Sequence, residues 1–282
     1  MESRFEQFIK SKLYLLGVTP RTVEWYRHSL RWLPSEQPTQ TDLNDLVRHL
    51  QDTGHKPTGV NCVARCVNSY LHWNSGADRK CGPGCTHPRI RPVREPKVVM
   101  PTFNEQQIRL LVQWKPKTKY QRRLHLLVLF LLDTGCRISE ALTLRVSSID
   151  MDNLLVTLDG KGRRQRIVPF SPELRRAMYR HITSLKLTSH DLLLGSRKGT
   201  EWARRNITRD VKKISRSLGF TAPARTLHAF RHSFAVSYLR RGGDVFRLQK
   251  TLGHSTLEMT RRYVNMTTDD LRETHARVSL LK

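Results

Sequence analysis

Apolar residues recur every three or four positions through the first quarter of the chain, and this spacing predicts amphipathic helices. The first helix should end at Gly17, because glycine readily terminates a helix. Thr19 and Pro20 then supply a capping hydroxyl and a first-turn proline for the next helix. The pattern predicts a small helical bundle from four segments, which cover residues 5–16, 20–33, 43–53 and 60–71.

The rest of the chain combines helical patterns with two short alternating segments. A capping box is expected at Thr102 to Glu105, ahead of further helices. A long apolar helix should run from about residue 120 to Thr134 and close at Gly135. Residues 154–158 and 166–169 are typical of strands, and the glycines in the intervening segment favour a tight turn. The expected fold class is therefore mainly α, with a small antiparallel β-sheet in the second part.

These patterns predict two domains. Residues 1–88 should form a helical domain, and residues 102–282 should form a larger α-rich domain with a tail helix at its end. Residues 89–101 carry prolines and arginines and are expected to be the linker.

The net charge indicates a polyanionic partner. The chain has 50 Lys and Arg against 24 Asp and Glu, for a formal net charge of +26. Residues 1–99 contribute +6 of this excess, and residues 100–282 contribute +20. Such an excess favours binding to nucleic acid phosphates by both parts of the chain.

Membrane insertion and secretion are not indicated. The longest apolar run, residues 126–132, is far shorter than the roughly 20 residues that a spanning helix needs. Residues 1–6 lack the basic and apolar pattern of a secretory leader. The protein is expected to be cytoplasmic, with no membrane partner.

Basic residues and one tyrosine near the C-terminus form a set suited to phosphodiester chemistry. A phenol is a nucleophile, arginines can hold the phosphoryl oxygens, imidazoles can donate, and a lysine can protonate the departing oxygen. Taken singly, each residue has an ordinary structural reading, such as a packed tyrosine or a helix-capping arginine. The set consists of Arg137, Lys161, His228, Arg231, His254 and Tyr263.

In order and spacing, this set resembles the signature of the tyrosine recombinase (phage integrase) family, in its simple two-domain Xer-like form. The family has an arginine in a Gly-containing turn, a hairpin lysine, a His-x-x-Arg pair, a histidine after Leu-Gly, and a tyrosine about nine residues later. All six positions are filled here. The resemblance covers most of the chain and implies that the N-terminal bundle is a core-binding (SAM-like) domain.

The resemblance implies an enzyme that cleaves and rejoins double-stranded DNA through a 3′-phosphotyrosine formed by Tyr263. It implies no cofactor, because the ester preserves the bond energy. It also implies a homotetramer on two DNA sites, with each C-terminal tail docking on a neighbour. Supporting roles fall to Glu140, which orients its arginine and histidine partners, and to His232, read as structural. The expected DNA contacts are Arg163, Arg164 and Arg166 after the hairpin turn, and Arg91 and Arg94 in the linker.

Several alternatives stay open from the sequence. A type IB topoisomerase shares the tyrosine chemistry but does not exchange strands, and a non-catalytic DNA-binding protein could keep the fold. Integration, excision, resolution and transposition are not distinguished. His228 and His232 have metal-pair spacing, but Arg231 between them would repel a cation. A structural zinc site is a further hypothesis, since enough ligand types occur close together, although the helical cysteines are equally well explained as core residues. The candidate zinc ligands are Cys81, Cys85, Cys62, Cys66 and His87.

Overall fold

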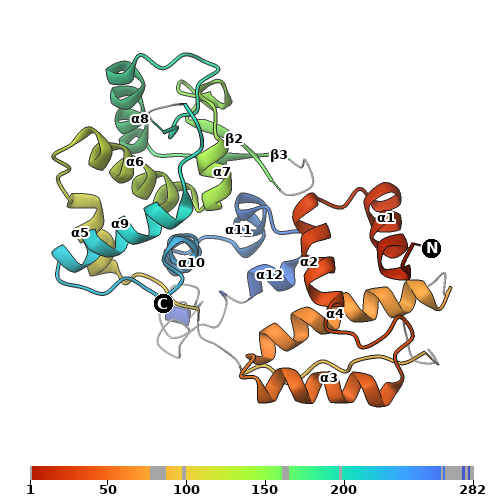
Figure 1. Ribbon diagram of the computed structural model, residues 1–282. Helices are drawn as coiled ribbons and strands as arrows, with labels where there is room; N and C mark the ends of the chain where they lie inside the picture. The colour runs from red at the N-terminus through yellow and green to blue at the C-terminus, as the bar shows by residue number, and fades with distance from the viewer. Residues whose placement is uncertain are drawn as a thin grey trace. The chain divides into compact units, whose positions relative to one another are not determined.

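The computed structural model divides into two compact units, Met1–Val98 and Val99–Lys282 (Figure 1). No helix in the described part of the chain is both long and apolar enough to cross a bilayer. The residues that the structure describes are 2–76, 87–96, 100–160, 165–196, 199–261, 263, 275–276 and 279.

The first unit is a bundle of four helices, as the hydrophobic spacing predicts. Helix α1 ends where Gly17 adopts a left-handed φ of 58°. Helix α2 begins with Pro20, and its Thr19 cap accepts a hydrogen bond from the backbone of Thr22. Phe8, Tyr26 and Tyr70 meet edge to face at the bundle's centre. The helices are α1 (Arg4–Leu16), α2 (Pro20–Leu30), α3 (Gln40–Asp52) and α4 (Pro57–Asn74).

The segment after the bundle packs on the first unit, which corrects the expected linker boundary. Ile90 is buried in the bundle core. The Asn68 side chain accepts from the Ile90 backbone N–H at 2.8 Å and donates to the Ile90 carbonyl at 2.9 Å. Asn61 makes the same pair of bonds with Val93, each of 2.8 Å. Residues 89–96 are therefore part of the first unit, because two side-chain amides on α4 satisfy their backbone groups.

The second unit is mostly helical and carries a small sheet. Helix α6 lies at its centre and packs against α5, α7, α8 and α10 (Figure 1). The helices are α5 (Glu105–Gln113), α6 (Lys119–Thr134), α7 (Ile138–Thr143), α8 (Pro172–Leu185), α9 (Arg204–Ser217), α10 (Thr226–Arg240), α11 (Val245–Leu252) and α12 (Leu257–Arg261).

The ends of α5 and α6 set the geometry of the residues that follow. The capping box of α5 is formed by Asn104 and Gln107, not by Thr102 and Glu105 as expected. Helix α6 ends at Gly135, which has a φ of 60° and lies against the Phe234 ring. A Cβ at this position would lie 2.2 Å from the ring, so both the turn and the packing require glycine here.

The sheet has three antiparallel strands in the order β1-β2-β3, one more than the sequence pattern indicates. Val156 pairs with Val168, and Asp159 pairs with Gln165. Residues 161–164, between the second and third strands, lie outside the described residues. The strands are β1 (Ile149–Asp150), β2 (Leu155–Asp159) and β3 (Gln165–Pro169).

Beyond Tyr263 the structure describes His275, Ala276 and Ser279. The Ser279 backbone N–H donates to the His275 carbonyl at 2.9 Å, which is the i to i+4 bond of a helical turn. The expected helix start at residues 268–271 lies outside the described residues.

Candidate active site

Arg137 stands at the N-terminus of α7, directly after the turn that Gly135 begins. Its backbone N–H donates to Glu140 Oε2 at 2.7 Å, and its Nη1 donates to Glu140 Oε1 at 2.8 Å. About a third of the Arg137 side chain is exposed. Glu140 thus caps its own helix and holds the Arg137 guanidinium.

Glu140 also binds a second arginine, which the sequence analysis places on DNA. Arg166 on β3 donates from Nη1 and Nη2 to the two Glu140 oxygens at 2.9 and 2.8 Å. Its Nε donates to the Thr251 carbonyl at 2.7 Å. The side chain is only 10% exposed and its nitrogens bond to protein atoms, which disfavours the expected DNA contact of Arg166. Burial opposes ionisation of Glu140, but the bonds from Arg166 and Arg137 outweigh it and lower its pKa to about 2.

Arg231 is buried on α10, between the ends of two other helices. Its Nη1 donates to the Gly135 carbonyl at 3.0 Å, and its Nη2 donates to the Leu252 carbonyl at 2.6 Å. Burial lowers the pKa of Arg231 to about 10, and the charge of Arg137 acts in the same direction. The side chain therefore stays cationic at neutral pH. Because a guanidinium has five N–H donors, these two bonds leave capacity for a phosphoryl oxygen.

His228 lies one helical turn before Arg231, near the start of α10. Partial desolvation lowers its pKa below the ordinary value of 6.5, and the charges of Arg225, Arg231 and Arg204 lower it further. The imidazole is therefore neutral at pH 7, and a neutral imidazole can accept a proton as well as donate one. Arg225 and Arg204 were not singled out from the sequence.

His254 and Tyr263 lie on either side of the short helix α12. Gly253 ends α11 in the left-handed conformation, and His254 follows it. The His254 Nδ1 lies 2.7 Å from the Thr260 hydroxyl. The His254 and Tyr263 rings are nearly parallel, with centroids 6.3 Å apart.

His232 contacts the candidate nucleophile, a contact that its structural reading did not include. Its Nδ1 lies 2.9 Å from the Tyr263 hydroxyl. His232 follows Arg231 on α10, so one helix supplies both a phosphate-binding candidate and a partner for the phenol. The residue is therefore a member of the site.

The structure brings Arg137, Arg231 and Tyr263 close enough for their charges to interact. After desolvation, the pKa of Arg231 is shifted most by the charge of Arg137, and then by those of Glu140, Tyr263 and Arg166. Lys161, Arg163 and Arg164 lie outside the described residues, so their expected roles stay predictions.

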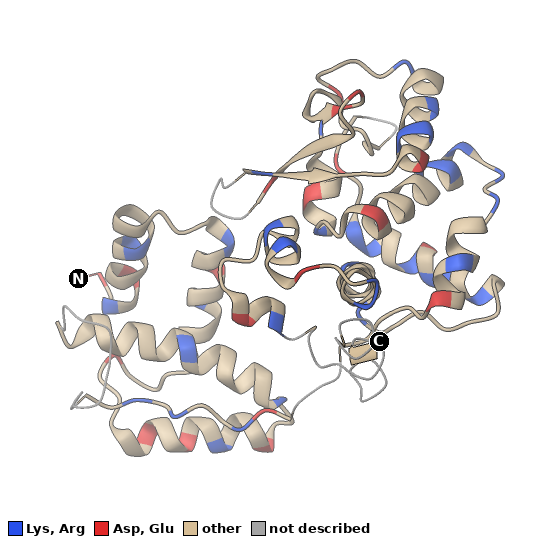
Figure 2. Cartoon of the chain, turned by 180° about the vertical axis from the view of Figure 1, so that it is seen from behind, with Lys and Arg blue, Asp and Glu red and all other residues tan. Residues whose placement is uncertain are grey.

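Helix α9 presents a basic face that the sequence analysis did not separate from the overall charge. Ile207, Val211 and Ser215 are buried, so the helix has one apolar side. Lys and Arg occur on both units, with acidic residues between them (Figure 2). In the first unit, Arg91 and Arg94 are exposed, in keeping with their expected role. The exposed basic residues of α9 are Arg204, Arg205, Arg209, Lys213 and Arg216.

Of the two candidate zinc ligands on α4, Cys66 is a core residue and Cys62 is half-buried. Cys66 is buried and its thiol donates to the Tyr26 carbonyl over 3.8 Å. Burial raises the pKa of Cys66 to about 12, which disfavours the thiolate that a metal requires. Among the residues that the structure describes, no three metal-ligating side chains gather. Cys81 and Cys85 lie outside the described residues, so their half of the zinc hypothesis stays a prediction.

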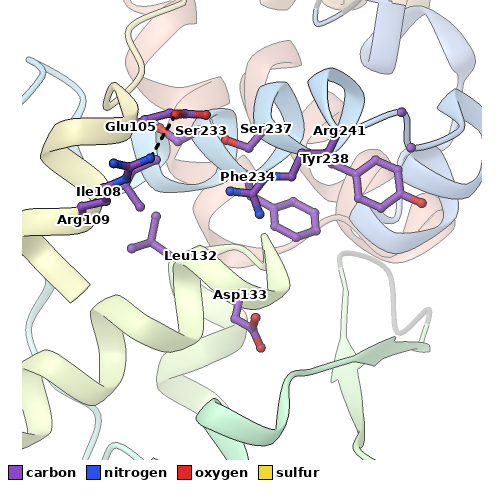
Figure 3. A pocket seen from close by; sticks show the side chains of 12 residues that line it. Glu105, Ile108, Arg109, Leu132, Asp133, Ser233, Phe234, Ser237, Tyr238 and Arg241 are labelled. Carbon is purple, nitrogen blue, oxygen red and sulfur yellow. Dashed lines mark ion pairs between the residues drawn. The ribbon is translucent and has the colours of Figure 1, made fainter. Parts of the chain in front are cut away.

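A pocket of about 460 Å³ lies between α5, the end of α6 and α10 (Figure 3). Its lining is mixed and includes both the Phe234 and Tyr238 rings and the Glu105–Arg109 ion pair. None of the five motif residues that the structure describes lines it. Phe234 and Tyr238 also pack against the apolar cluster that Tyr263 contacts, so the pocket adjoins the residues on which the candidate nucleophile packs.

Comparisons with known proteins identify the family of this chain. Residues 101–269 match the phage integrase family. The tyrosine recombinase XerA of Thermococcus kodakarensis is 28% identical, over 98% of this chain and 95% of its own. The tyrosine recombinase XerC of Brucella melitensis is 38% identical over half of this chain and 45% of its own length. Among solved structures, the Tn1549 transposon integrase in complex with transposon right end DNA has a TM-score of 0.76 at 20% identity, covering 98% of this chain and 99% of that one.

The fold and the site define a tyrosine-based DNA strand transferase. The chain belongs to the phage integrase family. It is a site-specific DNA recombinase of the tyrosine class.

Proposed function

We propose that Tyr263 attacks a DNA phosphate, and that Arg137 and Arg231 hold the non-bridging oxygens of this phosphate. The phenolic oxygen forms a 3′-phosphotyrosyl ester, and the bond from phosphorus to the 5′-oxygen breaks. A 5′-hydroxyl from a second strand then attacks the ester, releases the tyrosine and joins the new strand. Because one phosphate ester replaces another at each step, neither ATP nor a metal is needed.

The observation that carries this proposal is the grouping of Tyr263 with Arg231, Arg137 and His232. Arg231 is buried, cationic and held by two backbone carbonyls, so its donors are oriented before DNA arrives. Such preorganised donors stabilise the charge that develops in the transition state, at about 3–4 kcal/mol each. His232, at 2.9 Å from the phenol, and the neutral His228 are the candidates to take its proton.

Lys161 is assigned the protonation of the departing 5′-oxygen. The assignment rests on its place between β2 and β3 in the chain. Lys161→Ala should cleave normal DNA slowly, yet cleave DNA with sulfur in place of the 5′-bridging oxygen at nearly the wild-type rate. A thiolate leaves without a proton, so equal defects on both substrates would remove Lys161 from this role.

The working assembly is four protomers on two double-stranded DNA sites, with each tail docked on a neighbour. The net charge of +26 suits the phosphate density of two duplexes. A type IB topoisomerase activity is the alternative, and it differs in leaving strands unexchanged. Incubating the enzyme with two differently labelled sites distinguishes them, because only a recombinase makes hybrid products.

The direct test is covalent trapping. The wild-type protein is incubated with fragmented DNA from its source organism and then denatured. Protein that still carries DNA is isolated, and peptide mapping identifies the residue to which the DNA is attached. The adduct is expected on Tyr263, and sequencing the attached DNA identifies the site. Tyr263→Phe should bind this site with unchanged affinity and form no adduct, since only one oxygen is removed. An adduct on Tyr263→Phe would overturn the proposal.

A further inference from the structure

The side chain of Arg166 contacts segments that bind both candidate catalytic arginines, Arg137 and Arg231. It extends from β3 and receives no role in the chemistry proposed above. Its three nitrogens reach both oxygens of Glu140 and the Thr251 carbonyl, over 2.7–2.9 Å. The next residue after Thr251 is Leu252, whose carbonyl accepts from Arg231. A guanidinium held at three atoms by two other elements has little freedom to reorient.

Glu140 depends on this arginine. Its carboxylate side chain is 3% exposed, and Arg166 supplies two of the hydrogen bonds that keep it charged. Glu140 in turn holds the Arg137 guanidinium at 2.8 Å, while Arg137 keeps an exposed edge toward solvent. A carboxylate fixed on one side by Arg166 can present Arg137 in one orientation.

The packing around Arg166 is tight. A Cβ at Gly253 would lie 2.8 Å from the Cδ of Arg166, and Gly253 has a φ of +63°. Glycine at this position therefore both ends α11 and leaves room for the arginine.

We propose that Arg166 is a positioning residue, which acts through Glu140 to hold Arg137 in the orientation that grips the scissile phosphate. This inference rests on the proposed role of Arg137. In this role Arg166 does not contact DNA; it keeps Arg137 correctly oriented for the reaction.

The test compares wild type, Arg166→Met, Glu140→Gln, the double variant and Arg180→Gln, an exposed arginine on α8 as the charge control. The probe is a nicked duplex containing the site mapped by covalent trapping, at saturating concentration. Arg166→Met should form the adduct about 10- to 100-fold more slowly, the range expected from a small misplacement of a catalytic group. Its DNA affinity should match that of Arg180→Gln. Arg166→Lys should not restore the rate, because an ammonium cannot bind both carboxylate oxygens in a fork.

The double variant separates positioning from folding. Removing Arg166 alone leaves a buried carboxylate short of partners, and Glu140→Gln alone leaves a buried guanidinium without its carboxylate. The double variant removes both charges, so it should be at least as stable as Glu140→Gln. If Arg166 acts through Glu140, the double variant cleaves no more slowly than Glu140→Gln. Independent, multiplying defects would overturn the inference, as would an Arg166→Met rate equal to the control or a loss of DNA affinity that accounts for the defect. Absence of any wild-type adduct would instead contradict the proposed function.

Discussion

The hydroxyl of Tyr263 lies 2.9 Å from Nδ1 of His232, so the candidate nucleophile already has an imidazole partner before DNA is present. Either atom can donate in this pair, depending on the histidine tautomer. When the histidine accepts, it draws the proton from the phenol. When it donates, it holds the oxygen in place. In either arrangement, we expect His232 to contribute to the first step.

His232→Ala is expected to slow adduct formation about a hundredfold at saturating DNA, the usual order of effect for loss of a proton-transfer partner. DNA affinity should not change, because the residue is half-buried behind the tyrosine. His190→Ala, an exposed histidine outside the site, is the matched control. A His232→Ala rate equal to that of the control would mean that His232 contacts Tyr263 in the DNA-free protein but does not contribute to cleavage.

A second prediction concerns His228 and the pH dependence of cleavage. The pKa of His228 is lowered, partly by the charge of Arg225. If neutral His228 takes the phenol proton, the rate should fall as pH drops below that lowered pKa. Arg225→Gln removes a positive neighbour and raises the His228 pKa. The fall in rate on the acidic side of the pH–rate profile, its acidic limb, should therefore move to higher pH.

The comparison variant is Arg216→Gln, at the opposite end of α9 from Arg204. It also loses one positive charge, but it should leave the acidic limb in place. Rates are measured at saturating DNA over a pH series. An unmoved limb in Arg225→Gln would assign the proton to another base, with His232 the first candidate.

The third prediction is that Glu140 makes folding stability depend on acid. Its pKa is about 2 in the folded protein against 4.5 ordinarily. A group with a lowered folded pKa stabilises the protein above its unfolded pKa, and this contribution is lost as pH falls toward the folded value. The window is therefore pH 4.5 down to 2, and the contribution is roughly 3 kcal/mol.

Urea unfolding of wild type and Glu140→Gln checks this sign. Wild type should be the more stable at pH 7, and the difference in unfolding free energy should shrink as pH is lowered from 4.5. A difference that stays constant across this window would mean that the carboxylate is not held by its two arginines in the folded state.

Local patterns in the sequence predict the helices and the motif, because caps, glycine stops and apolar spacing act over a few residues. Contacts between distant segments are not visible in those patterns. Arg166 reads as one more cation of a basic hairpin, and its inward orientation comes from contacts with Glu140, 26 residues away, and Thr251, 85 residues away. Likewise, the amides of Asn61 and Asn68 look like ordinary helix positions until the segment at 90–93 lies against them.

The final prediction concerns the tail, where the i to i+4 bond at His275 indicates a helical turn. Residues 271–282 contain several apolar side chains, which can cover a neighbouring protomer. Deleting Leu271 to Lys282 should preserve binding to a single site and weaken both four-protomer assembly and cleavage. Lys282→Gln, which keeps the apolar residues, is the control.

A mixing experiment decides whether the tail acts on its own protomer or on a neighbour. The truncated protein keeps Tyr263 but has no tail, and full-length Tyr263→Phe keeps the tail but has no nucleophile. If the tail works in trans, the mixture should form the adduct that neither protein forms efficiently alone, and the labelled chain should be the truncated one. A denaturing gel identifies the labelled chain by its size. A mixture as inactive as its components would place the tail on its own catalytic unit, because a tail that docks in cis cannot help a protomer that lacks one.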